Sequence, residues 1–444
     1  MRERLAALGQ AMRVPDLRKR IMFLFAMLGI YVACAHVPLP GIDKAALENL
    51  FQGVGGIGDL VDAFAGGSLE RFSVMATGIM PYITAAIIMQ LLAMAIPAIE
   101  ELQKEGEYGR RKINAWTKYL TIAVATVQAL GMLAFFRSGA AFVGGPILMV
   151  YVVLMMVSGT AFLMWISDMI TEHGIGQGVS IMITAGVMTY MPQEIAATAA
   201  LWRGGEISLF NIGFLVVLML VTTYVIVKFQ KAERKISVQY ARRVRGHRVY
   251  GGQSSYLPLK VNQAGVMPII FAISVAMFPA QIAQVLTSPA SIERISGIIN
   301  VSDEAVSRAM FSLVQFTTPG QNAVASFLYF VLVVIFTYFY TAVTFNPEQI
   351  AENLQKNGGA IPGIRPGAKT RDYLDRILYR ITLAGALFLG VIALMQYYVG
   401  DLTGVTTFTL VGGTSLLIVV GVTLHTMEQI EAQLLMRHYR GFLK

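Results

Sequence analysis

The side chains that most often carry chemistry in proteins are few in this chain and stand far apart. There is a single cysteine, Cys34, which excludes a disulfide framework, a thiolate zinc site and an iron–sulfur cluster. The five histidines, at positions 36, 173, 247, 425 and 438, do not show the short spacings of a metal site. The sequence therefore predicts no resident metal or cofactor.

Motifs for phosphate binding and for hydrolysis are also missing. The glycines at 174, 176 and 178 look superficially like a nucleotide loop, but no strand is expected before them. The chain has neither a Gly-Lys-Ser/Thr phosphate loop nor a Gly-x-Ser-x-Gly element. We therefore expect a protein that is not an enzyme, and any energy that it uses must come from a partner.

The composition indicates the class of protein and hence the kind of secondary structure that positions its side chains. Of the 444 residues, 55% are hydrophobic and only 14% are charged, and the mean hydropathy is +0.61. A soluble domain carries about 25% charged residues, and disordered chains are poor in the aromatic residues that make up 10% of this one. The sequence therefore predicts an integral membrane protein.

Ten stretches of at least 18 residues lack Asp, Glu, Lys and Arg. About 20 apolar residues cross the hydrocarbon core of a membrane as a helix, so we expect an all-α polytopic membrane protein with ten transmembrane helices. None of these spans carries the central acid or base that ion-coupled transporters usually bury. The ten stretches are Ile21–Ile42, Phe72–Ile99, Tyr119–Phe136, Ser138–Ser167, His173–Gln193, Ile207–Val227, Val261–Ile292, Ala309–Pro347, Ile381–Gly400 and Leu402–Met427.

The positive charges predict the orientation. Residues 1–20 hold six Lys and Arg and precede an uncharged run that is too long for a signal peptide, so we expect a cytoplasmic arm before a retained helix. With both termini in the cytoplasm, 29 of the 35 Lys and Arg residues lie on the cytoplasmic side. An excess of this kind is typical of the cytoplasmic loops of membrane proteins.

Two of the expected cytoplasmic loops, about 228–260 and 346–380, are long and polar. The first contains the basic stretch ARRVRGHR and the second the stretch GIRPG. One interpretation is that this charge orients the chain and attracts anionic lipid. The other is that the loops form a docking surface for a large anionic partner. The pattern alone does not separate the two.

A short pattern repeats in the second and seventh spans. Gly78–Ile83 (GIMPYI) is followed 187 residues later, five spans on, by Gly265–Ile270 (GVMPII). Because five is odd, the second copy enters the membrane from the opposite side, which is typical of inverted repeats with a functional path between the halves. Pro81 and Pro268 predict kinks within these spans. The repeat alone also allows a small-solute secondary transporter, although the lack of membrane charges counts against ion coupling.

One further segment is amphipathic but too short to span. Its apolar residues fall at i, i+3, i+4 and i+7, and two glycines follow it. It either lies on the outer leaflet of the membrane or folds back to close a cavity. These residues are Ile57, Leu60, Val61 and Phe64.

Seven stretches, in order and at family spacing, resemble the SecY family of bacterial protein-conducting channels, and the resemblance covers nearly the full length of the chain. They are PLPGID (38–43), FAGGSLERFSVMATGIMPYITAAIIMQLL (64–92), KEGEYGRRKI (104–113), GTAFLMWISDMITEHGIGQGVSIMI (159–183), LPLKVNQAGVMPIIFA (257–272), TAVTFNPEQIAENLQKNGGAIPGIRPG (341–367) and VGGTSLLIVVGV (411–422).

The resemblance implies two inverted five-helix halves around a central pore, residues 21–200 and 201–430, and a cytoplasmic tail, residues 431–444. It implies a lateral gate between spans 2–3 and 7–8, with Pro81 and Pro268 at the gate, and an external plug helix at about 57–71. The family's constriction ring carries over to Ile79, Ile83, Val179, Ile183, Ile270 and Ile418. The valine departs from isoleucine at the other five positions but keeps the ring apolar.

The resemblance also implies the function and the partners. The expected function is to pass unfolded secretory polypeptides across the bacterial plasma membrane and to release transmembrane segments sideways into lipid. The expected partners are SecE-type and SecG-type small membrane subunits, the SecA motor ATPase, the ribosome, and precursors with their signal sequences. The resemblance implies that the motor or ribosome docks on the tip of the first loop, at Arg242, Arg243, Arg245 and Arg248, and on the key arginine of the second loop, Arg365.

Overall fold

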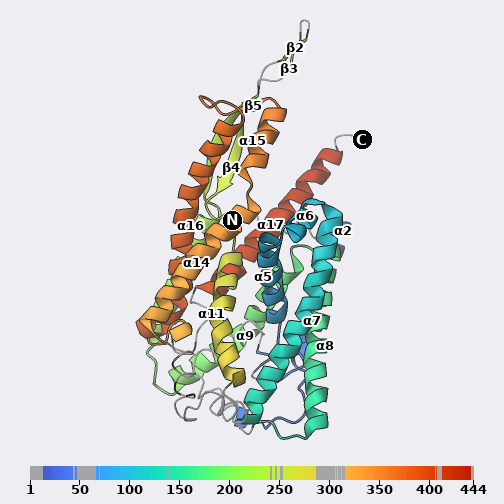
Figure 1. The fold of residues 1–444 in the computed structure, drawn as a ribbon. Helices are drawn as coiled ribbons and strands as arrows, with labels where there is room; N and C mark the ends of the chain where they lie inside the picture. The colour runs from blue at the N-terminus through green and yellow to red at the C-terminus, as the bar shows by residue number, and fades with distance from the viewer. Residues whose placement is uncertain are drawn as a thin grey trace.

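The computed structural model shows a mostly helical molecule, as the sequence predicts (Figure 1). It describes residues 14–43, 46–47, 67–69, 71–138, 141–240, 243–245, 248–250, 254–286, 306, 308, 312, 316–405, 407 and 413–441.

Each of the ten uncharged stretches overlaps one long helix. These helices are α2 (Pro15–Ala35), α5 (Met80–Ala95), α7 (Glu107–Ser138), α8 (Pro146–His173), α9 (Gly178–Arg203), α10 (Leu209–Gln230), α11 (Met267–Leu286), α14 (Ala323–Thr344), α16 (Ala368–Thr403) and α17 (Thr414–Gly441). Two shorter helices are α6 (Pro97–Lys104) and α15 (Pro347–Lys356).

Several of these helices can cross a membrane by their length and composition. Among the described residues, five pass this test: Glu107–Ala134 of α7, α8, α10, Ala323–Lys356 of α14 and α15, and α16. The helix pair α5 and α6 passes together but is bent by 107°. These helices support a multi-pass membrane protein, and the count of ten spans stays a prediction.

The bend between α5 and α6 has a local cause. Ile96 lies between the two helices with φ −113° and ψ 110°, which is extended backbone. It precedes Pro97, and the proline ring disfavours helical geometry in the residue before it. The predicted span Phe72–Ile99 therefore ends at a sharp turn.

The prolines of the repeat begin helices rather than kink them. Pro81 is the second residue of α5, and Pro268 is the second residue of α11. A proline fits this position because the first amides of a helix have no partner within it. The predicted mid-span kinks are therefore wrong. The prolines that do lie inside described helices are Pro192 in α9 and Pro279 in α11.

The two long polar loops fold together into one lobe, which the sequence analysis did not predict. Strands β1 (Glu233–Tyr240), β4 (Ser254–Lys260) and β5 (Gly359–Ala360) form an antiparallel sheet in the order β4-β1-β5. The sheet, α15 and the start of α16 share a small apolar core of Ile236, Leu259, Ile361, Leu374 and Ile377. A hairpin of β2 (Arg243–Arg245) and β3 (Arg248–Tyr250) forms the tip of the lobe (Figure 1).

The two predicted halves meet along α11 and α17. Figure 1 shows α5, α7 and α8 on one side of the molecule and α14 and α16 on the other, with α11 and α17 between them. Helix α11 contacts α5 and α7 as well as α14 and α16, and α17 contacts α9, α10 and α16. The largest hydrophobic core consequently draws residues from both halves.

Candidate functional site

The six residues assigned to the constriction ring lie in one hydrophobic cluster. Five of them are buried, with exposed fractions of 1 to 5%, and Val179 is partly buried against the others. They come from the beginnings of four helices that are far apart in sequence: Ile79 and Ile83 from α5, Val179 and Ile183 from α9, Ile270 from α11, and Ile418 from α17. The structure thus places all six in its largest hydrophobic core, which holds many other residues as well. Their arrangement as a ring and their role as a seal stay predictions.

The two copies of the repeat have the same local structure. Gly78 and Gly265 both have left-handed backbones, with φ of 55° and 66°, which glycine adopts at little cost. In each copy the carbonyl of the next residue accepts hydrogen bonds from the amides three and four positions further on, at 3.1 and 3.2 Å in the first copy and 3.2 and 3.4 Å in the second. Ile83 and Ile270 therefore occupy equivalent places.

A second repeat, which the sequence analysis missed, carries three more of the assigned ring residues: Val179, Ile183 and Ile418. Gly178–Ile183 (GVSIMI) and Gly413–Ile418 (GTSLLI) share the pattern Gly-x-Ser-Ile/Leu-Met/Leu-Ile. Each glycine lies against the backbone of the preceding long helix: an added Cβ would come within 1.8 Å of the Ser167 carbonyl oxygen or 1.9 Å of that of Ile392. The final isoleucine of each copy is a ring residue. The ring thus contains two pairs of equivalent isoleucines, and this pattern was present in the sequence.

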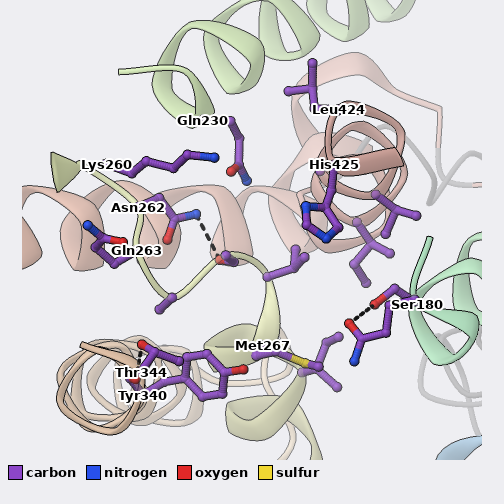
Figure 2. Close-up of a pocket in the computed structure, with 18 of the residues that line it drawn as sticks. Ser180, Gln230, Lys260, Asn262, Gln263, Met267, Tyr340, Thr344, Leu424 and His425 are labelled. Carbon is purple, nitrogen blue, oxygen red and sulfur yellow. Dashed lines mark hydrogen bonds between the residues drawn. The ribbon is translucent and has the colours of Figure 1, made fainter. Parts of the chain in front are cut away.

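A cavity of about 450 Å³ lies against the ring, on the side of the polar lobe. Ile183, Ile270 and Ile418 form its apolar end. Polar side chains from several elements line the rest of it, and Figure 2 shows them around the space. Two charged side chains, Lys260 and Glu428, also line the cavity, and they form an ion pair with 3.2 Å between Nζ and Oε2. The other polar lining residues are Gln177, Ser180, Gln230, Asn262, Gln263, Tyr340, Thr344, His425 and Thr426.

The assigned plug residues, Ile57, Leu60, Val61 and Phe64, lie outside the described residues. The chain that follows them is firmly packed. Leu69 and Phe72 are buried in a second hydrophobic core with α7 and α8. The Nη1 atom of Arg71 is 2.7 Å from Nε2 of His36 at the end of α2, and its Nη2 donates to Gln193 Oε1 of α9 at 3.5 Å. Arg71 therefore links the chain at this point to the end of α2 and to α9.

Four of the five assigned docking arginines belong to the polar lobe. Arg243, Arg245 and Arg248 lie in the β2–β3 hairpin at its tip, and Arg242 lies outside the described residues. Arg365 is exposed, in the turn between β5 and α16. Its carbonyl oxygen accepts a hydrogen bond from Thr370 Oγ1 at 3.1 Å, so the backbone of this turn is held while the side chain faces outward.

The chain is similar to known proteins over nearly its whole length. The sequence model of the SecY family matches residues 73–427. A protein translocase subunit SecY from Thermus thermophilus is 41% identical, covering 99% of this chain and 98% of its own. A solved protein-conducting channel matches with a TM-score of 0.65 and 17% identity, over 94% of this chain and 92% of its own. Sec61 in a canine ribosome–channel complex from the endoplasmic reticulum matches with a TM-score of 0.61 and 16% identity, over the same shares of the two chains. At these identities the two structures show the fold alone.

Proposed function

Because the chain belongs to the SecY family, we propose that it is a protein-conducting channel that passes unfolded secretory polypeptides across a membrane. The observation that carries the proposal is that the six assigned ring residues, which come from four helices of both halves, all lie in the hydrophobic core that joins the halves. A polar-lined cavity adjoins this cluster on the side of the lobe. The cavity receives the polypeptide, and the cluster is the narrow part of its path.

The chemistry of the ring suits a seal that must also open. A narrow apolar constriction is poorly wetted, so ions find no hydration in it and do not cross. Isoleucine side chains offer a passing polypeptide no hydrogen bonds or charges, so the ring can deform around it without holding it. The energy for directed movement comes from a partner.

The contact of α11 with α5 and α7 supports a lateral gate. Separation of α11 from these two helices opens the path toward lipid. A transmembrane segment that leaves sideways gains about 0.8 kcal/mol for each CH₂ group that it buries, which offsets the loss of the helix contacts. The plug, assigned to residues 57–71, covers the ring from the external side until a polypeptide arrives.

The partners and the location are those of the family. The lobe of β1, β4, β5 and α15 presents its hairpin and Arg365 to the SecA motor or to the ribosome; one protein of similar fold was solved in a ribosome–channel complex. SecE-type and SecG-type subunits complete the assembly in the membrane. The protein lies in the bacterial plasma membrane with both termini in the cytoplasm.

A translocation assay tests the function. In inverted vesicles that hold this protein with its SecE-type partner, SecA and ATP, we expect a secretory precursor to become protected from added protease. Protection must disappear when detergent opens the vesicles. If the precursor stays accessible although SecA hydrolyses ATP and the protein is correctly oriented, the channel proposal fails. Saturable solute uptake driven by an ion gradient would favour a secondary transporter instead.

The docking role of the lobe gives a separate prediction. Arg365→Glu should reduce motor- or ribosome-driven transport at least about tenfold, because placing like charges together at an interface costs more than the roughly 1.4 kcal/mol that a tenfold effect requires. The held turn leaves the fold intact, so the midpoint of thermal unfolding should not change. Lys369→Glu makes the same change of charge on an exposed residue four positions away and serves as the control. Equal transport by both variants would refute a specific role for Arg365.

A further inference from the structure

A short loop between α8 and α9 is held by two other helices. The loop, residues 174–177, joins the end of α8 to the start of α9. The carbonyl of Gly174 accepts a hydrogen bond from Nη1 of Arg20 in α2 at 3.3 Å. The N–H of Gly176 donates to Oε1 of Gln429 in α17 at 2.9 Å. The loop is therefore fastened to the first described helix of the chain and to the last.

Apolar packing supports the contact with α17. Ile430, the residue after Gln429, is 4% exposed and forms a small hydrophobic core with Ile175 of the loop and Leu17 of α2. Gly176 has φ of 88°, a left-handed backbone that glycine adopts at little cost. Two consecutive residues of α17 thus hold two consecutive residues of the loop, one by packing and one by a hydrogen bond.

Gln429 lies on the same face of α17 as the assigned ring residue Ile418. The two are eleven residues apart, which is close to three full helical turns. On the other side of the contact, Gly176 precedes Val179 by three residues and Ile183 by seven. The hydrogen bond therefore joins the two helices that carry three of the six assigned ring residues.

The Gln429 amide has a partner at each end. Its oxygen accepts from the loop, and its Nε2 lies 3.3 Å from Nε2 of His425, one turn earlier in α17. These contacts fix the orientation of the amide. At its opposite end, α17 follows Gly413, which lies against the backbone of α16 at the Ile392 carbonyl. Ile418 thus lies between two points at which α17 is held by neighbouring elements.

We infer that Gln429 is a positioning residue for the ring: it holds the start of α9 at a fixed place along α17 and so keeps the assigned ring residues of both helices together. This inference rests on the proposed function. Without the acceptor, the Gly176 N–H loses its partner in a partly buried loop, which is costly where the loop stays in place. The start of α9 then shifts relative to α17. An apolar constriction that widens admits water and ions, so the resting channel leaks.

The test compares Gln429→Met with Gln429→Glu. Methionine has a similar length, but its thioether is a weak acceptor. Glutamate keeps a strong oxygen acceptor for the Gly176 N–H. Gln433→Met is the matched control, because it makes the same substitution one turn further along α17, where the described part of the structure shows no hydrogen bond to the loop.

Each variant is measured in two ways. Resting conductance in planar bilayers should rise about two- to tenfold in Gln429→Met and should stay at the wild-type level in Gln429→Glu and Gln433→Met. Hydrogen exchange of the purified complex should follow the same pattern in a peptide that covers residues 174–178, with faster exchange only in Gln429→Met. A role in stability alone would lower the midpoint of thermal unfolding without any leak.

The outcomes separate this inference from the channel function. A wild-type conductance in Gln429→Met, or an equal leak in Gln429→Glu or Gln433→Met, would overturn the positioning role while the channel stands. If the wild-type protein does not protect a precursor, the proposed function itself fails, and hydrogen exchange still reports on the contact between Gln429 and the loop. Should Gln429→Met not assemble, Gln429→Leu removes the same acceptor and must give the same leak.

Discussion

Channels with Ile418→Gly or Ile83→Gly will conduct ions at rest, at least about tenfold more than wild type. Both side chains are almost fully buried in the ring cluster, with exposed fractions of 1% and 5%. Their removal widens the apolar constriction and lets water enter, which lowers the barrier to ions. A barrier lowered by only about 1.4 kcal/mol already gives a tenfold increase in rate. Single-channel recording in planar bilayers, without precursor, measures the effect.

The control must separate the loss of the seal from the loss of stability. Ile166→Gly removes an isoleucine of α8 that is 0% exposed and belongs to the same cluster, but not to the ring. It carries the same cost of a cavity and of a glycine within a helix, about 3–5 kcal/mol together. We expect it to lower the thermal stability as much as the ring variants and to leave the resting conductance low. Equal leak from Ile166→Gly would show that the leak comes from general loosening, and low leak from both ring variants would contradict the ring.

Sequence repeats place four of the six assigned ring residues at equivalent positions, but the ring itself follows only from the family resemblance. The GIMPYI and GVMPII copies are visible in the sequence, and the structure gives Ile83 and Ile270 the same hydrogen-bonding pattern. The second repeat, ending in Ile183 and Ile418, was equally present but was missed. Gly178 begins α9 and Gly413 directly precedes α17, and both lie within uncharged stretches, so a search for long apolar runs passed over them.

The polar lobe shows what local pattern could not predict. Strand β5 has two residues, which is too short for any period to be visible, and it pairs with the end of β1 through Gln239 and Ala360. This contact joins residues that are 121 positions apart in the chain, with the long helices α11 and α14 between them. The pairing of β5 with β1 is therefore determined by the packing of the two distant loops against each other and not by local sequence. The start of α5, in contrast, could have been predicted, because proline is favoured in the first turn of a helix and disfavoured in its interior.

A methyl group at Gly413 will destabilise the protein and open the seal at the same time. The Cβ of Gly413→Ala would lie 1.9 Å from the Ile392 carbonyl oxygen, so backbone must move. Gly413 also has φ of 69°, where alanine is strained. Together these effects should cost on the order of 3 kcal/mol. Because α17 begins at the next residue, a shift here also displaces Ile418. We expect a lower midpoint of thermal inactivation in detergent and a raised resting conductance.

Two further glycines make the result specific. Gly178→Ala meets the Ser167 carbonyl oxygen at 1.8 Å but not with a left-handed φ, so it should lose somewhat less stability, about 1–3 kcal/mol, and should leak through displacement of Ile183. Gly213→Ala, in α10, has no atom within 4 Å of the new methyl group and should be neutral or stabilising. If Gly413→Ala matched Gly213→Ala in both stability and conductance, the close approach of α17 to α16 could not be what holds Ile418 in the ring.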